Sequence, residues 1–349
     1  MTDYDVSIHS SIDELNENQW NNLVRQSDLG SLFHRAEWFR VVERTLDCVP
    51  RHIVVSTDGN PVAILPNFRT ALYVPEWTDF TDQFPLTEVV SSRPGYGGPI
   101  ISSDEGRCLE LLLEEVDDIG GLNVMHTVRT NNLGFARYGK AFAKHGYKPL
   151  GVNCRFRIDL DREWESIRDD MDKERRRALR TMRDHDVQIR RERLDEDLDT
   201  TYDAYRKNIE RADGSAFPRA FFEELHDQLG DAVTVEIVTV DGQDVGRFIY
   251  LHDDEQDTLH HYFAAIGDED YFEYHPSELL TAAGIKWGKE QGYRYYDLGG
   301  TGADFSNSGF RYKERYGATL VPTIQWQTGL SLAWPAYKIA RSLYRKSHY

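Results

Sequence analysis

The sequence is poor in cysteine and has no long apolar run. Its three cysteines, Cys48, Cys108 and Cys154, are odd in number and far apart, so they predict neither a disulfide framework nor a cysteine-based metal site. No apolar run approaches the roughly 20 residues that cross a bilayer. The acidic N-terminus also lacks the hydrophobic segment of a secretion signal. We therefore expect a soluble, cytoplasmic protein with no metal site.

Basic residues are also fewer than acidic ones. The 349 residues include 59 acidic side chains against 41 lysines and arginines, which gives a formal charge of −18. Such a field opposes general nucleic-acid binding, to DNA in particular, and favours solubility. Because the acidic residues are spread along the whole chain, we interpret the composition as that of a halophilic protein, in whose salt-rich cytoplasm ions screen self-repulsion.

Common catalytic signatures are missing as well. The chain contains no Gly-x-Ser-x-Gly, no phosphate-binding P-loop, no His-Glu-x-x-His and no paired CxxC. Gly300-x-Gly302 resembles half of a dinucleotide-binding fingerprint. However, Phe305 stands where the third glycine belongs, and no acidic residue follows at the expected distance, so we reject that interpretation.

What the sequence does contain is a repeated pattern. Residues 293–317 have a fainter copy at 120–147, in which a β-rich segment, a polar turn, Gly-Phe, a basic helix and a Tyr/Gly stop follow in the same order. Each copy is preceded by an Asp-Gly hairpin, at Asp58-Gly59 and Asp241-Gly242. Landmarks in the same order indicate a tandem duplication, and the length suits two domains with separate cores.

The predicted fold class is α/β, because strands alternate with helices around the central hairpins. Each domain should hold a mixed, mostly antiparallel sheet flanked by helices. We place the domains at residues 1–160 and 161–327, with the second carrying the site and residues 328–349 able to pack back on the first. We also expect an irregular excursion over 70–98, one long charged helix ending at His185, and a helix over 277–291.

A basic stripe is the first candidate site. At 100° per residue, one face of the helix after residue 171 carries five cations, and the other face is apolar. In an acidic chain this stripe points to a phosphate, a pyrophosphate or an RNA backbone as ligand. The alternative is a solvated face that pairs with the protein's own carboxylates. The cations are Lys173, Arg176, Arg177, Arg180 and Arg183.

The second candidate site is the end of the strand that carries Asp297. Gly299 and Gly300 follow the acid, which places a carboxylate where a ligand can approach the backbone closely. Asp297 could orient an amine or accept its proton. The alternative is a buried aspartate that caps the next turn.

The third candidate is Lys313, which stands among aromatic residues that include Tyr312. Such a lysine can hold a carboxylate or phosphate, or stabilise developing negative charge. An amphipathic helix with snorkelling basic residues is the alternative. His260 and His261 point to opposite faces of a strand, so at most one reaches a site. The amphipathic segment 335–346 could touch an acidic membrane surface, although packing onto the first domain is favoured.

Several of these motifs together resemble the Fem-type (FemAB-like) aminoacyl and acyl transferases and their acetyltransferase-like relatives, which are double-domain members of the GNAT superfamily. In the second half they are the basic helix KERRRALRTMR from Lys173, YDLGGTG from Tyr296 and GFRYKERYGA from Gly309. In the first half, FHRAEWFRVVE, DGNPVAILPNF and GYGGPI match the family's N-terminal pattern. The resemblance extends from about Phe33 to Ile324.

The resemblance implies two GNAT-like domains, with the final segment often returning to the first. The implied reaction is transfer of an acyl or aminoacyl group to an amine, with acyl-CoA or aminoacyl-tRNA as co-substrate and no resident cofactor. Lys313 would contact an acceptor carboxylate or stabilise transition-state charge. Arg176, Arg177 and Arg180 would bind phosphate groups of the donor or the acceptor.

One segment departs from the family pattern. GNAT enzymes that use acetyl-CoA cradle its pyrophosphate in a glycine-rich loop at a helix N-terminus. Here residues 268–275 contain four acids and no glycine, which should repel a pyrophosphate.

The sequence as a whole predicts an N-acyltransferase. An amine, deprotonated with help from Asp297 or His261, would attack a thioester donor directly, without a covalent enzyme intermediate. One alternative is aminoacyl-tRNA-dependent transfer to an amino group of a cell-envelope or peptide precursor. The other is a non-catalytic ligand-binding protein on a degenerate fold.

Overall fold

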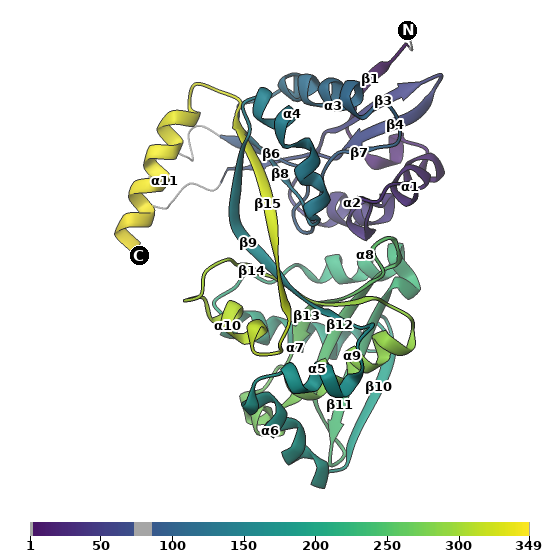
Figure 1. Ribbon diagram of the computed structural model, residues 1–349, viewed down its shortest axis with the longest axis vertical. Coiled ribbons are helices and arrows are strands. Elements are labelled where there is room, and N and C mark those ends of the chain that lie inside the picture. Colours follow the sequence, from purple (N-terminus) through teal and green to yellow (C-terminus); the bar gives the residue numbers. More distant parts are fainter. Residues whose placement is uncertain (1–2, 73–85, 349) are drawn as a thin grey trace. The chain divides into compact units, whose positions relative to one another are not determined.

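The computed structural model describes residues 3–72 and 86–348 (Figure 1). The chain divides into two compact units: unit 1 comprises Met1–Gly151 and Thr323–Tyr349, and unit 2 comprises Val152–Pro322. The first division falls inside strand β9 (Lys148–Asp159) and the second inside β15 (Thr319–Gly329). Unit 2 is therefore one continuous segment, whereas unit 1 is assembled from both ends of the chain.

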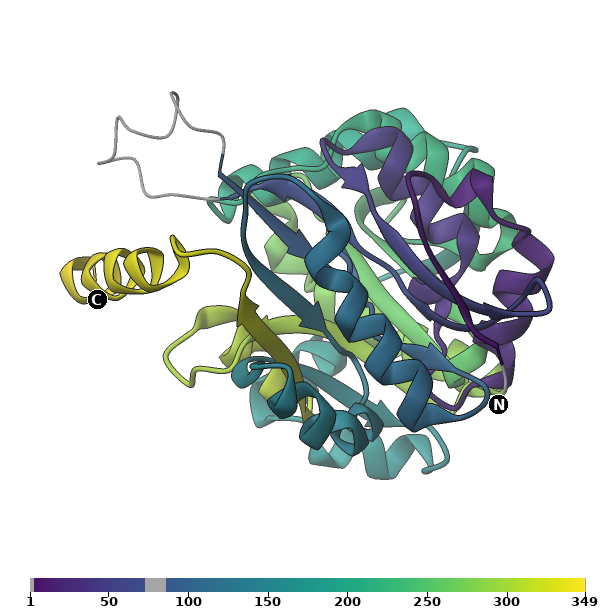
Figure 2. The same cartoon turned by 90° about the horizontal axis from the view of Figure 1, so that it is seen from above.

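Unit 1 contains two sets of paired strands. In the first set, β1, β3, β4 and β7 are neighbours in that order, and all three pairings are antiparallel. The hairpin between β3 and β4, drawn in purple in Figure 2, turns at Asp58 and Gly59, which have φ of 49° and 75°. Two successive positive φ values match the twist of a tight hairpin, as the Asp-Gly signal predicts. The strands are β1 (Asp5–His9), β3 (His52–Thr57), β4 (Asn60–Leu65) and β7 (Ile100–Ile101).

The second set in unit 1 has the order β15, β8, β6, β5 and β2. Its β6 and β8 are parallel, with Val89 opposite His126. The prediction of an irregular segment over 70–98 is therefore wrong for β6, and residues 73–85 lie outside the described part of the chain. The remaining strands are β2 (Val49–Pro50), β5 (Phe68–Ala71), β6 (Thr87–Val90) and β8 (Asn123–Arg129).

Most of the helices in unit 1 bury apolar side chains. In α2, Trp38, Phe39 and Val42 are fully buried. The C-terminal helix α11 (Trp334–His348) packs Trp334 and Tyr337 against a small cluster around Val124. No helix in residues 3–72 and 86–348 combines the length and the apolar character that a membrane span requires. The other helices are α1 (Glu17–Gln26), α2 (Ala36–Thr45), α3 (Glu105–Glu114) and α4 (Gly139–Lys144).

Unit 2 is built on six strands in the order β10, β11, β12, β13, β14 and β9. All neighbours are antiparallel except β13 and β14. Asp241 and Gly242, with φ of 50° and 84°, form the second predicted hairpin turn. The mixed, mostly antiparallel sheets confirm the predicted fold class. The strands are β10 (Val187–Arg193), β11 (Val233–Val240), β12 (Gln243–Asp253), β13 (Thr258–Ala265) and β14 (Tyr295–Gly302).

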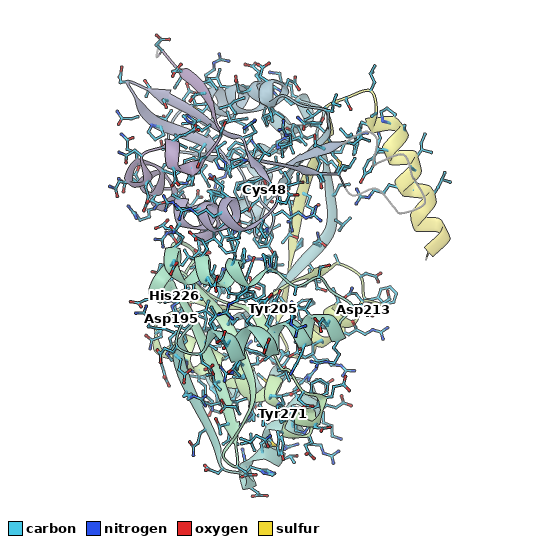
Figure 3. All side chains as sticks on the ribbon, turned by 180° about the vertical axis from the view of Figure 1, so that it is seen from behind. Cys48, Asp195, Tyr205, Asp213, His226 and Tyr271 are labelled. Carbon is cyan, nitrogen blue, oxygen red and sulfur yellow. The ribbon has the colours of Figure 1, made fainter. Side chains whose placement is uncertain are left out.

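Helices cover both faces of this sheet. On one face, Tyr205 of α7 (Leu198–Arg211), labelled in Figure 3, and Phe222 of α8 (Arg219–Leu229) pack on Phe263. On the other face α9 (Pro276–Glu290) lies very close to the strands, because a Cβ added at Gly284 would stand 2.2 Å from the Tyr250 hydroxyl.

The long charged helix predicted to end at His185 is in fact two helices. The first, α5 (Trp164–Asp170), ends before Met171, and the second, α6 (Lys173–Thr181), begins after Asp172. The Asp172 carboxylate accepts a hydrogen bond from the Glu174 amide at 2.6 Å, so it caps α6 and interrupts the helical path.

Glu236 is a buried acid in the centre of unit 2. It accepts a hydrogen bond from Tyr250 and pairs with Arg191 of β10. Burial raises the pKa of Glu236 to about 7, although Arg191 opposes the shift. A raised carboxyl pKa means that the folded state binds the proton more tightly than the unfolded state does. The stability should therefore fall as pH rises from about 4.5 towards 7.

We expect Glu236→Gln to flatten the stability of the protein over this pH range, because the amide does not titrate. Urea unfolding followed by tryptophan fluorescence at pH 5 and pH 7 measures the change, with the exposed Glu165→Gln as control. A Glu236→Gln variant that keeps the wild-type pH slope would contradict the assignment.

Candidate functional site

The parallel strands β13 and β14 stay together over only three residues each. Thr258 lies opposite Tyr295, and the last matched pair is His260 with Asp297. Beyond this pair the described strands share no further ladder. Backbone groups on the facing edges are then open to a ligand.

Each of these strands contains a bulge at the point of divergence. Tyr262 is the extra residue where the register of β13 with β12 shifts. The register of β14 with β9 shifts between Asp297 and Gly300. Gly299 there has φ of +82°, and a Cβ added to it would stand 3.3 Å from both the His261 carbonyl oxygen and Lys313 Nζ. Glycine fits because a larger residue would be strained and crowded.

Lys313 reaches this place from α10 (Ser308–Glu314). Asn307 caps the helix by accepting a hydrogen bond from the Phe310 amide at 3.1 Å, and Phe310 anchors it in the core of unit 2. Lys313 Nζ donates a hydrogen bond to the Gly300 carbonyl at 2.9 Å. Burial lowers the pKa of Lys313 to about 8. Across the described ranges, no carboxylate forms an ion pair with it, so the amine is held beside the bulge without neutralisation.

Asp297 is fully buried and belongs to a network. Its Oδ2 lies 2.7 Å from Arg155 Nη1 and 3.5 Å from His260 Nδ1, and its Oδ1 accepts a hydrogen bond from the Gly299 amide at 2.7 Å. Burial alone would raise the pKa of Asp297, but Arg155 and His260 hold it well below its usual range. An acid held this firmly ionised is a poor proton acceptor, so the geometry favours a structural role over that of a base.

The two adjacent histidines have different environments. His260 lies near the carboxylates of Asp253 and Asp297; burial lowers its pKa, but these two acids outweigh burial and leave it raised. The His261 ring stacks on Phe248, with 3.6 Å between centroids, and burial lowers the pKa of His261 to about 3. A neutral imidazole with so low a pKa is a weak base, so His261 suits a packing or hydrogen-bonding role.

A separate pocket in unit 2 has a volume of about 900 Å³. Its walls come from α5, α6, β10 and α9, and basic side chains predominate among its polar residues. Four of the five cations of the predicted stripe line it, whereas Arg177 does not. The basic lining consists of Arg168, Lys173, Arg176, Arg180, Arg183, Arg191 and Lys286.

Tyr312 lies apart from that pocket lining and is engaged with other side chains. Its hydroxyl is 3.1 Å from that of Tyr316, and the guanidinium of Arg175 lies over both rings. Arg175 also pairs with Glu278 in the first turn of α9. The sequence predicts Tyr312 as an anion-binding residue. In the structure its ring contacts Arg175 and its hydroxyl contacts Tyr316.

Sequence reasoning did not identify Arg155, Arg168, Arg191 or Lys286 as site residues. Each lies on a different element from the residues that it contacts, so no spacing pattern along the chain predicts that it belongs to a site. The one available signal is that Arg155 stands between two apolar residues, Cys154 and Phe156, and that arginine is costly to bury.

Residues 166–314 match the family model described as an acetyltransferase (GNAT) domain. Unit 2 is therefore an acyltransferase domain of the GNAT type, and the general reaction is transfer of an acyl group. No curated protein matches the sequence.

Solved structures share the fold, among them three that align over most of this chain. FemX is 14% identical and aligns over 93% of this chain and 98% of its own, with a TM-score of 0.69. A tandem GNAT protein from the clavulanic acid biosynthesis pathway is 11% identical over 94% and 99%, with a TM-score of 0.55. L-PGS from Bacillus licheniformis is 13% identical over 93% and 95%, also at 0.55. These similarities confirm the fold of two GNAT-like domains that the resemblance implies.

We expect Asp297→Asn to destabilise the protein by about 3–5 kcal/mol, because it leaves Arg155 buried without its counter-ion. The free energy of unfolding in urea measures the loss. Asp203→Asn is the matched control, since Asp203 is exposed on α7. If both variants were equally stable, the buried pair would not have the structural importance assigned to it.

Proposed function

We propose that the protein transfers an acyl group from an activated donor, with a thioester as the first choice, to an amine. The reaction would take place where β13 and β14 diverge. The observation that carries the proposal is Lys313, which is partly buried, lacks a carboxylate partner among the described residues and lies against Gly299 and Gly300. This amine stands where charge would develop in the acyltransferase domain that the family match identifies.

The chemistry requires no covalent bond to the protein. The acceptor nitrogen attacks the acyl carbon, the C–N bond forms, and the bond to the leaving thiolate breaks. The nitrogen then gives up one proton, and the thiolate takes up one, either directly or through water. Negative charge gathers meanwhile on the carbonyl oxygen, which open backbone amides and a nearby ammonium group stabilise. Lys313 would supply the ammonium group. Cys154 is a poor candidate for a nucleophile, because burial raises the pKa of its thiol and so disfavours the thiolate.

Asp297 would act as a positioning residue in this scheme. Through the Gly299 amide it fixes the bulge that brings the backbone of β14 to Lys313. The ammonium form of the acceptor would lose its proton to water or before binding, since neither Asp297 nor His261 is a suitable base. Gly299 and Gly300 contribute close backbone approach, without a side chain.

Aminoacyl-tRNA is the second candidate for the donor. The 3₁₀ segment Glu269–Tyr274 before α9 carries acids, with Asp268 capping it and Glu278 in the next turn. These charges oppose a pyrophosphate at the α9 N-terminus, the usual place for coenzyme A in the superfamily. Aminoacyl-tRNA, whose activated group is an ester, avoids that clash and would pass its aminoacyl group to an amine of a cell-envelope or peptide precursor.

Native mass spectrometry separates these possibilities. The protein is titrated with acetyl-CoA, a longer acyl-CoA and bulk aminoacyl-tRNA, and each binder is then incubated with a panel of amines. Formation of an N-acylated amine from a thioester supports the first choice, and aminoacylation that requires tRNA supports the second. Binding without turnover of any donor would overturn the proposal.

With the active donor, we expect Lys313→Met to lower kcat/KM by about 100-fold or more, because a charge stabiliser is lost. The exposed Lys148→Met is the control. If the charged form acts, wild-type kcat/KM should fall as pH rises through about 8. Lys313→Arg should retain part of the activity and lose that fall. An inactive Lys313→Arg with a rate that rises through pH 8 would instead make the neutral amine a base.

A further inference from the structure

The pocket between α5, α6, β10 and α9 combines a charge surplus with an apolar floor. Seven basic side chains line it against two acidic ones, Asp169 and Glu290, in a protein whose formal charge is −18. Arg168 pairs with Asp169, and Arg191 pairs with Glu236. The other five form no ion pair with any carboxylate of the described chain: Lys173, Arg176, Arg180, Arg183 and Lys286.

This arrangement is unfavourable for folding by itself. Lys173, Arg176 and Arg180 follow one another at spacings of three and four residues on α6, where like charges repel. Lys173 and Arg176 also stand in the early turns of the helix, where its dipole disfavours cations. Acidic residues are plentiful in this chain, so neutralisation was available and is absent. Arg176 donates a hydrogen bond to the Asp169 carbonyl oxygen at 2.7 Å, and Lys286 lies over the Trp164 ring, but neither contact neutralises a charge. Charges left without a counter-ion in this way are the mark of a binding site.

The floor of the pocket is mainly aliphatic. Leu279, Ala282 and Ala283 come from one face of α9, and Val187 and Ile189 come from the edge strand β10. The two tryptophans each have a cation of the protein over the ring, Lys286 over Trp164 at 4.7 Å and Arg191 over Trp287 at 4.8 Å. Aliphatic surface suits a hydrocarbon chain, whereas bases of a nucleic acid need open aromatic faces for stacking.

From these features we infer that the pocket binds an amphiphile with a phosphate-ester head and an apolar chain. The head would lie among Arg176, Arg180 and their neighbours, since guanidinium groups bind phosphate in a bidentate manner. The chain would lie on the floor formed by α9 and β10. A volume of about 900 Å³ is sufficient for such a ligand. A long polyanion fits less well, because the formal charge of −18 on the whole protein repels it.

This site is independent of the proposed transfer reaction. Lys313, Gly299 and Asp297 are not among the residues that line the pocket. Binding can therefore be measured without turnover, and the failure of either proposal leaves the other standing.

The test is isothermal titration with butyl, hexyl and octyl phosphate below their micelle concentrations. We expect affinity to rise by about three- to fourfold for each methylene that enters the pocket. Inorganic phosphate and an uncharged octyl glucoside should bind weakly. Repeating the titration in about 1 M KCl removes diffuse attraction and leaves direct contacts. An affinity that depends on phosphate alone, with no effect of chain length, would overturn the inference.

Arg180 and Arg177 offer a matched pair of variants on the same helix. Both are exposed, and the same charge is removed from each, but only Arg180 lines the pocket. We expect Arg180→Met to weaken octyl phosphate binding by about tenfold or more, and Arg177→Met to change it by less than about twofold. Equal losses would mean a diffuse electrostatic effect and would contradict a built site.

Filling the floor tests the apolar half separately. Ala283→Phe should abolish the dependence on chain length while inorganic phosphate binding is unchanged, with circular dichroism confirming the fold. Vesicles with phosphatidic acid then distinguish a membrane lipid from a free phosphate ester as the source of the ligand; binding of either one supports the site. Tight binding of a short single-stranded RNA, with none of octyl phosphate, would overturn it.

Discussion

The buried pair of Asp297 and Arg155 is the interaction on which the candidate site depends. Both side chains are removed from water, so the pair resists opening, because either partner alone would be an uncompensated buried charge. The same carboxylate holds the Gly299 amide and thereby the bulge in β14. The bulge brings the Gly300 carbonyl to Lys313. A buried ion pair thus determines where an exposed strand edge and a reactive amine meet.

Much of the fold follows from local signals. Both Asp-Gly hairpins form with the positive φ values that the dipeptide favours, and α9 begins at Pro276, as the residue type indicates. The errors have local causes too. Asp172 acts as a cap in the middle of a helical charge pattern and divides it in two. Strand β6 is short and pairs with β8, over thirty residues away in the sequence. The prolines and glycines of residues 70–98 therefore suggest an irregular segment where a strand lies.

The candidate site was predictable only where its chemistry is contiguous. Asp297 and Gly299 are neighbours in the sequence, and Lys313 stands within a recognisable aromatic helix. Arg155 could not be found in this way, because it joins them across the β9–β14 pairing. The pocket cations come from α5, α6, the 3₁₀ turn Met182–Asp184, β10 and α9. A helical wheel identifies which face of α6 is basic, but it does not show which residues of that face reach the pocket. It therefore includes Arg177, which does not line the pocket.

The interrupted path of the chain has a consequence for biosynthesis. Unit 2 is a continuous segment, whereas β15 completes the strands of unit 1 only near the C-terminus. Domains generally fold as units while the ribosome extends the chain. Unit 2 can therefore close while the first part of unit 1 still lacks its last strand, and the exposed edge of β8 must wait for that strand. In this protein the first residues to be synthesised belong to the last unit to be completed.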